Sequence, residues 1–137
     1  PRQNPNGAYA AVIPLFAKAL IENKPPVING TGENSRDFTY VANAVQANIL
    51  SLFTQSPAAV NQVYNIACGE QLSLVQLYEL LKQEAGSDLE PVFGPARQGD
   101  VLHSLADISK AKDLLGYEPT VKAREGLGMT YRWYKEQ

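Results

Sequence analysis

The chain has 137 residues and a formal net charge of −2, from 12 basic and 14 acidic side chains. Its composition, 45% hydrophobic and 19% charged, is typical of one globular domain, and it argues against nucleic-acid or membrane-surface binding by general electrostatics. The single cysteine, Cys68, excludes an internal disulfide and favours a reducing compartment. With no signal peptide and no apolar run approaching about 18 residues, we expect a cytoplasmic protein without a membrane partner.

The first half of the chain predicts two helices and two short strands. The opening "PRQNPNG" has turn chemistry and no helix start, as in the middle of a loop. Apolar residues at helical spacing then predict a helix from Val12 to about Asn23, with Pro14 in its first turn. "VING" and "DFTYV" are predicted as strands on either side of a "TGENSR" turn. The next helix is predicted from Ala42 to about Thr54.

The second half predicts two further strands and three helices. "QVYNIA" is rich in β-forming residues, and "EPVFGPA" is predicted as an edge strand because of its proline. Ser73 and Gln76 form a capping box for a helix that ends near Gly86. Another helix starts near Ser109 and is stopped by Gly116, and the last carries Leu127, Tyr131 and Tyr134. We therefore predict an α/β fold with about five helices around short, partly parallel strands.

Several motifs that would carry chemistry are absent from the sequence. It has no glycine-rich dinucleotide fingerprint, no phosphate-binding P-loop, no metal-ligand spacing of Cys and His, and no nucleophile elbow. We therefore expect no cofactor-binding or metal-binding residue within the chain. Cys68 is expected to be a small buried hydrophobic residue.

Three charged residues in predicted loops are the candidates for a binding site: Arg36, Arg97 and Asp100. Two guanidinium groups on separate loops can clamp a diphosphate, because each forms bidentate, charge-assisted hydrogen bonds to phosphate oxygens. A carboxylate cannot bind phosphate, but it accepts hydrogen bonds from sugar or ribose hydroxyls. The residues alone leave open the alternative that all three are solvated surface charges.

The order of four motifs resembles the C-terminal part of the NAD-dependent sugar-nucleotide epimerases and dehydratases, which are extended short-chain dehydrogenases/reductases. The motifs are "AVIPLF", "VINGTGENSRDFTYVANAVQANILSL", "QVYNIACGEQLSLVQLYELL" and "RQGDVLHSLADISKAKDLLGYEPTVKAREGL". This resemblance covers nearly the whole chain. It implies that residues 1–137 form one UDP-sugar-binding part of such an enzyme, which is inactive by itself.

The resemblance also implies what the rest of such an enzyme supplies. A Rossmann domain that binds NAD and carries the catalytic Tyr-x-x-x-Lys pair would lie upstream of Pro1, and the full-length enzyme would be a homodimer through that domain. A part separated from a larger core leaves apolar surface unburied. We therefore expect an exposed apolar face where the Rossmann domain packs.

The family's substrate-binding residues can be carried over to matching positions. Arg36 and Arg97 match two pyrophosphate-binding arginines, and Asp100 matches the acid that accepts from the ribose hydroxyls of uridine. The weaker matches are two residues beside the nucleotide and a strand whose backbone edge lies against the base: Val12 and Pro14, and Val27, Ile28 and Asn29. For Val12 and Val27, a plain core role stays open.

Ser104 corresponds to the position that borders the C2 substituent of the sugar in the family's 4-epimerases. A small serine leaves room for an N-acetyl group. The resemblance is strongest to the bacterial UDP-N-acetylglucosamine 4-epimerases of surface-polysaccharide pathways, whose substrate can also be the uronic acid. His103 beside it is expected to be packed or solvent-facing, and Asp107 to cap the following helix.

Other functions remain open at this point. The chain could be the substrate part of a related nucleotide-sugar dehydratase, decarboxylase or reductase, or a stand-alone nucleotide-sugar binding module without catalysis. A glycine-rich strand-to-helix turn and a Tyr-x-x-x-Lys pair before Pro1 would support the enzymes.

Overall fold

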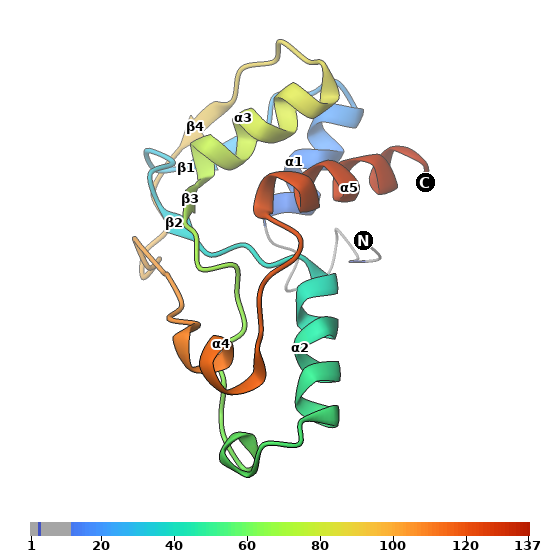
Figure 1. Ribbon diagram of the computed structural model, residues 1–137. Helices are drawn as coiled ribbons and strands as arrows, with labels where there is room; N and C mark the ends of the chain where they lie inside the picture. Colours follow the sequence, from blue (N-terminus) through green and yellow to red (C-terminus); the bar gives the residue numbers. More distant parts are fainter. Residues whose placement is uncertain (1–2, 4–11) are drawn as a thin grey trace. The chain divides into compact units, whose positions relative to one another are not determined.

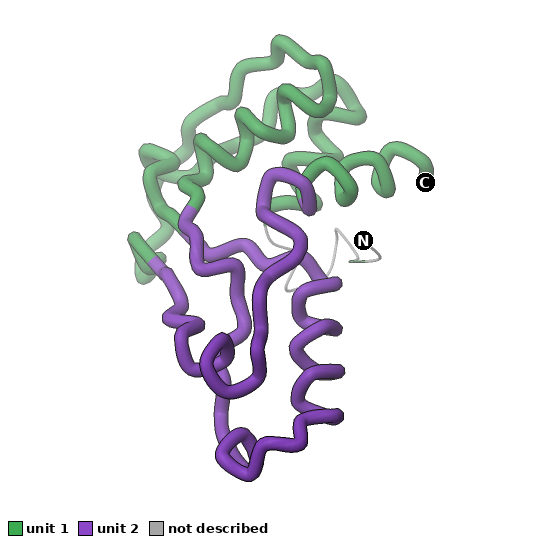
Figure 2. Tube along the Cα trace, in the orientation of Figure 1, with its two compact units in different colours: residues 1–35, 72–103, 127–137 green, residues 36–71, 104–126 purple. Residues whose placement is uncertain are grey.

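A computed structural model describes Gln3 and residues 12–137, which form two compact units (Figure 2). Unit 1 comprises residues 1–35, 72–103 and 127–137, and unit 2 comprises residues 36–71 and 104–126. The described residues contain five α-helices and four short strands, labelled in Figure 1. The predicted α/β fold with about five helices is confirmed.

Unit 1 combines two helices with one pair of parallel strands. Its complete elements are α1 (Val12–Ile21), β1 (Val27–Asn29), β3 (Leu72–Ser73), α3 (Leu74–Ala85) and β4 (Val92–Gly94). Helices α1 and α3 contact each other, and the ring of Phe16 packs edge-on against Tyr78 with centroids 5.4 Å apart. Strands β1 and β4 run parallel, with Ile28 opposite Phe93. Ile28 is buried, which anchors this pair to the apolar interior of the unit.

The ends of α3 are set by the two signals expected from the sequence. The Ser73 hydroxyl accepts from the backbone N–H of Gln76, and the Gln76 side chain accepts from the N–H of Ser73, so the predicted capping box is present. The helix stops at Gly86, whose φ of 63° lies in the left-handed region that glycine adopts without a steric cost.

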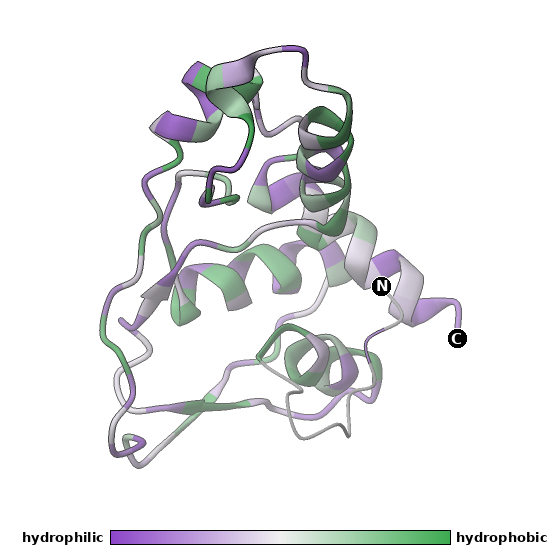
Figure 3. Cartoon of the chain, turned by 90° about the horizontal axis from the view of Figure 1, so that it is seen from below, coloured by the Kyte–Doolittle hydropathy of each residue, from purple (hydrophilic) through white to green (hydrophobic). Residues whose placement is uncertain are grey.

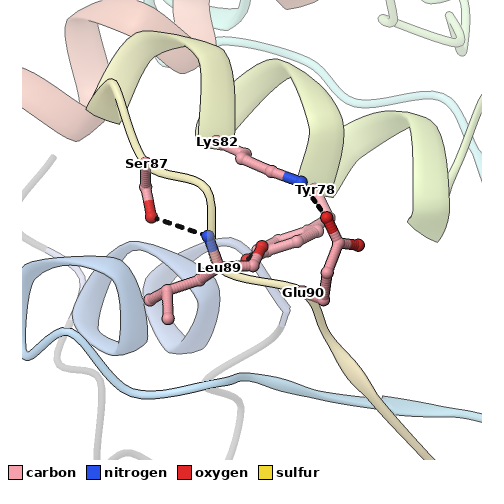
Figure 4. Close-up of polar contacts among 5 residues, drawn as sticks. All are labelled: Tyr78, Lys82, Ser87, Leu89 and Glu90. Atoms are coloured by element: carbon pink, nitrogen blue, oxygen red, sulfur yellow. Dashed lines mark hydrogen bonds and ion pairs between the residues drawn. The ribbon is translucent and has the colours of Figure 1, made fainter.

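Side-chain contacts hold the segment that leads from α3 to β4 (Figure 4). The Tyr78 hydroxyl donates to the carbonyl of Leu89 at 2.8 Å, and the Ser87 hydroxyl accepts from the N–H of Leu89 at 3.2 Å. Lys82 forms an ion pair with Glu90 just beyond. The course of the chain into β4 is therefore fixed by α3 itself.

Unit 2 is built around small side chains. It contains α2 (Val41–Phe53), a short 3₁₀ helix (Pro57–Ala59) and α4 (Ser109–Leu115). Its core cluster consists of Ala47, Ala59, Ala67, Ile108, Ala111, Leu115 and Tyr117. Two elements cross the boundary between the units along the chain: β2 (Ser35–Arg36), which pairs with β3, and α5 (Ala123–Lys135).

Buried polar groups in unit 2 connect segments that are distant in sequence. The amide of the fully buried Asn43 donates to the Val121 carbonyl at 2.7 Å and accepts from the Val121 N–H at 3.0 Å. The Asp37 carboxylate accepts from the backbone N–H groups of Cys68 and Gly69 at 2.9 and 3.0 Å. These bonds satisfy groups that would otherwise be buried at a cost.

Two of the predicted strands are wrong. "DFTYV" is irregular before α2 begins, and "QVYNIA" forms no strand. In the second segment the interactions run through side chains: the Tyr64 hydroxyl donates to the Ala59 carbonyl, and the Tyr117 hydroxyl donates to the Ala67 carbonyl. Tyr64 and Ile66 pack against the core of unit 2, Val63 is exposed, and none of them joins a strand ladder. In contrast, β3 was not predicted, and β2 lies inside the predicted "TGENSR" turn.

An apolar face runs along the exposed side of α2. It consists of residues that are between 52% and 76% exposed: Val41, Val45, Ile49, Leu52 and Phe53. Hydrophobic and hydrophilic residues alternate along the helices in Figure 3, as in helices that bury one side. In α2, however, only Asn43 and Ala47 are buried; Leu50 packs against the core cluster, and the other large apolar residues are exposed. An exposed apolar face of the expected kind is therefore present.

Candidate functional site

The candidate site lies where the two parallel strands of unit 1 end. The carboxyl ends of β1 and β4 are at the same edge, and ligands of α/β proteins commonly bind outside such ends. The 30s loop (residues 30–35) follows β1, and the 90s loop (residues 95–103) follows β4. The Gly30 N–H donates to the Gly94 carbonyl at 3.0 Å, and a Cβ on Gly30 would lie 3.4 Å from that of Ala96. The two loops therefore leave the strands side by side.

Further along, hydrogen bonds join the 30s loop to the 90s loop. The amide of Asn34 donates to Oδ2 of Asp100 at 3.0 Å. The backbone N–H of the buried Ser35 donates to the Leu102 carbonyl at 2.8 Å, and its hydroxyl lies 2.9 Å from Nδ1 of His103. The C-terminal half of the 90s loop is thus held against the 30s loop.

Unit 1 brings together three of the residues predicted from the sequence. Arg97 is exposed at the start of a turn in which the Asp100 N–H faces the Arg97 carbonyl at 3.4 Å, with Gly99 at a φ of 79°. Asn29 is the last residue of β1, and its side-chain oxygen would lie 3.5 Å from a Cβ on Gly94. A cationic, an acidic and an amide side chain therefore lie on segments that meet beyond the strand ends.

Arg36 and Ser104 belong to unit 2. Arg36 is half-buried and follows Ser35 directly, while Ser104 is exposed and follows His103 directly. Each is therefore the chain neighbour of one member of the bonded Ser35–His103 pair. A clamp formed by Arg36 and Arg97 would combine residues of both units, and it stays a prediction.

The weaker candidates differ in burial. In α1, Pro14 is buried and Val12 is half-buried. In β1, Ile28 is only 1% exposed, so its side chain belongs to the core and only its backbone is left for a ligand. Val27 is 59% exposed, so a plain core role for it is wrong.

Two residues of unit 2 were assigned structural roles from the sequence. The Asp107 carboxylate accepts from the N–H of Ser109, the first residue of α4, at 2.9 Å, but the N-cap position itself is Ile108, so the predicted cap is confirmed only as a bond to the first turn. Hydrogen bonds from the Ser109 side chain and backbone lower the pKa of Asp107. Cys68 is buried as predicted, and burial raises the pKa of its thiol, with the Asp37 charge adding to the shift.

Neither the contact of Asn34 with Asp100 nor the bond between Ser35 and His103 was predicted from the sequence. The available signal was the polar pair Asn34–Ser35 directly after the "TGE" turn, at a place where a loop would be expected to expose its side chains. No group of three His, Cys, Asp or Glu side chains in the described part of the chain could hold a metal ion. Likewise, none of the helices described is both long and apolar enough to cross a membrane.

Comparisons with known proteins give a consistent set of matches. The family model described as GDP-mannose 4,6 dehydratase matches residues 1–130. A UDP-glucose 4-epimerase from Thermotoga maritima, solved with UDP-glucose, is 40% identical, with a TM-score of 0.90 over 99% of this chain and 42% of its own. A UDP-N-acetylglucosamine 4-epimerase from Methanobrevibacter ruminantium, solved with UDP-N-acetylmuramic acid, is also 40% identical, with a TM-score of 0.90 over 100% and 43%.

A third solved structure includes a cofactor. It is a UDP-glucuronic acid 4-epimerase from Bacillus cereus in complex with UDP-glucuronic acid and NAD, 32% identical, with a TM-score of 0.88 over 99% of this chain and 42% of its own. The chain thus spans about two fifths of the length of these proteins, and it corresponds to their C-terminal part.

Proposed function

We propose, given that the chain belongs to the GDP-mannose 4,6 dehydratase family of extended short-chain dehydrogenases/reductases, that it is the UDP-sugar-binding part of an NAD-dependent 4-epimerase. The observation that carries this proposal is the joining of the 30s and 90s loops beyond the ends of β1 and β4. That arrangement supports a site for a polar, anionic ligand, since it gathers Arg97 and Asp100 on one turn.

Each end of the ligand has its own proposed contacts. Arg36 and Arg97 bind the pyrophosphate, because the guanidinium fork matches phosphate oxygens. Asp100 accepts hydrogen bonds from the ribose hydroxyls, because an ionised carboxylate is an acceptor, whereas the guanidinium of an arginine can only donate. The backbone of Val27, Ile28 and Asn29 faces the base, and α1 contributes Val12 and Pro14 beside it.

The proposed substrate is a UDP-N-acetylhexosamine or its uronic acid, with Ser104 leaving room for the N-acetyl group. The relatives do not choose between sugars, because two solved structures of equal identity were determined with UDP-glucose and with UDP-N-acetylmuramic acid. The small, exposed Ser104 therefore carries this part of the proposal. A role in surface-polysaccharide biosynthesis follows from that substrate class.

NAD is assigned to a Rossmann domain outside this chain, because the sequence contains no dinucleotide fingerprint. When bound, NAD accepts and returns the hydride at C4 of the sugar. The residues of this chain hold the nucleotide end, and their binding energy positions the reacting carbon at a distance. We place the enzyme in the cytoplasm as a homodimer formed through that domain, with no nucleic-acid or membrane partner.

Calorimetric titration with UDP tests the binding site. The measurement uses the intact protein, meaning this chain together with any residues that precede or follow it. Arg36→Ala and Arg97→Ala should each weaken UDP binding by about 1 to 3 kcal/mol, the usual range for a hydrogen bond to a charged partner. Lys110→Ala is a suitable control, since this cation lies over the Tyr64 ring in unit 2. If UDP affinity is unchanged in an arginine variant that folds normally, that arginine is a surface charge.

A further inference from the structure

Asn34 occupies a distinctive position in unit 1. It lies in the 30s loop, yet its amide group donates to the Asp100 carboxylate, 66 residues later in the chain, at 3.0 Å. Asn34 is half-buried. Its contact with a carboxylate on another loop therefore indicates a defined relation between the two loops.

The residue after Asn34 also forms hydrogen bonds between the 30s loop and the 90s loop. Ser35, next to Asn34, bonds through its backbone to Leu102 and through its hydroxyl to His103. The backbone N–H of Leu74 also donates to the Asn34 carbonyl at 3.1 Å, so the start of α3 fixes the main chain of Asn34. The Asn34 side chain thus projects toward Asp100 from a backbone that is bonded both to the start of α3 and, through Ser35, to the 90s loop.

We propose that Asn34 is a positioning residue for nucleoside recognition, which orients the Asp100 carboxylate toward the ribose hydroxyls of the bound nucleotide. This inference rests on the proposed function. An ionised carboxylate has two oxygens with about four acceptor sites, and Asn34 donates to one of these oxygens, Oδ2. A carboxylate held in one orientation loses less side-chain entropy when the ligand binds than a freely rotating one.

The proposal predicts a specific dependence on the ribose. Asn34→Ala removes the contact to Asp100 but leaves the backbone of the 30s loop and the position of Arg97 unchanged. The variant should therefore bind UDP more weakly by about three- to ten-fold, the effect of one hydrogen bond of ordinary net strength. Its affinity for 2′,3′-dideoxy-UDP, which lacks both ribose hydroxyls, should equal that of the wild type.

The experiment is calorimetric titration of the intact protein with these two nucleotides, on the wild type and five variants. Arg97→Ala should lower the affinity for both nucleotides, because both carry the diphosphate. Asp100→Ala should lower the affinity for UDP alone, and the double variant Asn34→Ala/Asp100→Ala should be no weaker than Asp100→Ala. Asn65→Ala is the matched control, since it removes a similar exposed amide bond, to the Asp107 carbonyl in unit 2, and should change neither affinity.

Four outcomes would overturn the proposal. If Asn34→Ala loses the same affinity for both nucleotides, Asn34 has a general role in loop structure. If the losses of UDP affinity from the two single variants add up in the double variant, Asn34 does not act through Asp100. Unchanged UDP binding in a folded Asn34→Ala protein, with Arg97→Ala still weakened, would overturn this inference alone. Absence of UDP binding in the wild type would overturn the proposed function together with it.

Discussion

Ser104 follows His103 directly, and His103 is bonded to the buried Ser35. The backbone that carries Ser104 therefore starts from a point that is held by the 30s loop. At a position next to such an anchor, the chain cannot easily withdraw when a larger side chain is introduced. The proposed discrimination between an N-acetyl group and a hydroxyl at C2 of the sugar depends on this restraint of the backbone.

Ser104→Tyr in the intact protein should exclude the N-acetyl group by steric overlap while the smaller hydroxyl of an unacetylated hexose is tolerated. Overpacking of a formed pocket costs about 1 to 3 kcal/mol, so the ratio of kcat/KM for UDP-N-acetylglucosamine over UDP-glucose should fall roughly ten- to a hundred-fold. Steady-state kinetics on both sugars provide the ratio, with Ser104→Ala as the control that keeps it. A parallel loss for both sugars would indicate damaged folding, and an unchanged ratio would show that Ser104 does not face the sugar.

At the residue scale, the sequence alone could identify charged side chains but not their partners. Arg97 and Asp100 stood out because they bracket a glycine in a loop, and unit 1 indeed has them on one turn. Asn34 could not be found in this way, because its role depends on a contact across 66 residues. Local patterns indicate residue types and spacing, whereas such pairings arise only from the tertiary fold.

At the element scale, the helices carry clear local signals and the strands do not. The capping box of α3 and the left-handed Gly86 are determined by neighbours in sequence, so they could be predicted. The strands have two or three residues each, and their existence depends on which distant segment lies beside them. "QVYNIA" has β-forming residues, but in unit 2 two of them, Tyr64 and Ile66, pack against the core cluster instead.

The cap of α3 gives a prediction about stability. Ser73→Ala removes the acceptor for the Gln76 N–H and half of the capping box, which should lower the free energy of unfolding by about 1 kcal/mol. Chemical denaturation monitored by circular dichroism is the measurement. Ser51→Ala, at an exposed position inside α2, serves as the control and should be neutral or slightly stabilising, because alanine favours the helix interior. Equal stability of Ser73→Ala and the wild type would contradict the role of the cap.

At the scale of the whole molecule, the exposed apolar face of α2 is the feature that the chain alone does not explain. Soluble proteins rarely expose a contiguous row of large apolar side chains unless another surface covers it. Since the relatives are more than twice as long as the region they share with this chain, we expect the NAD-binding domain of the intact protein to cover this face.

Substitutions along α2 test that expectation. Ile49 is 52% exposed in the described chain, and burial of its side chain against another domain would stabilise the protein by about 2 kcal/mol. Ile49→Lys should therefore lower the Tm of the intact protein in a thermal scan, whereas Asn48→Lys, at the adjacent exposed position, should not. If both variants unfold at the temperature of the wild type, the face is open to solvent and the NAD-binding domain packs elsewhere.

The most direct test of the account follows the reaction itself. The intact protein is incubated with NAD and, in separate reactions, with UDP-N-acetylglucosamine and its uronic acid, and the sugar products are observed by proton NMR. From UDP-N-acetylglucosamine we predict the C4 epimer, UDP-N-acetylgalactosamine, at equilibrium with the starting sugar. There should be no net oxidation, because the hydride removed at C4 is returned to the same carbon. A product that has lost water or carbon dioxide, a net change in NAD, or no conversion of this sugar or its uronic acid by a protein that binds UDP, would contradict the account.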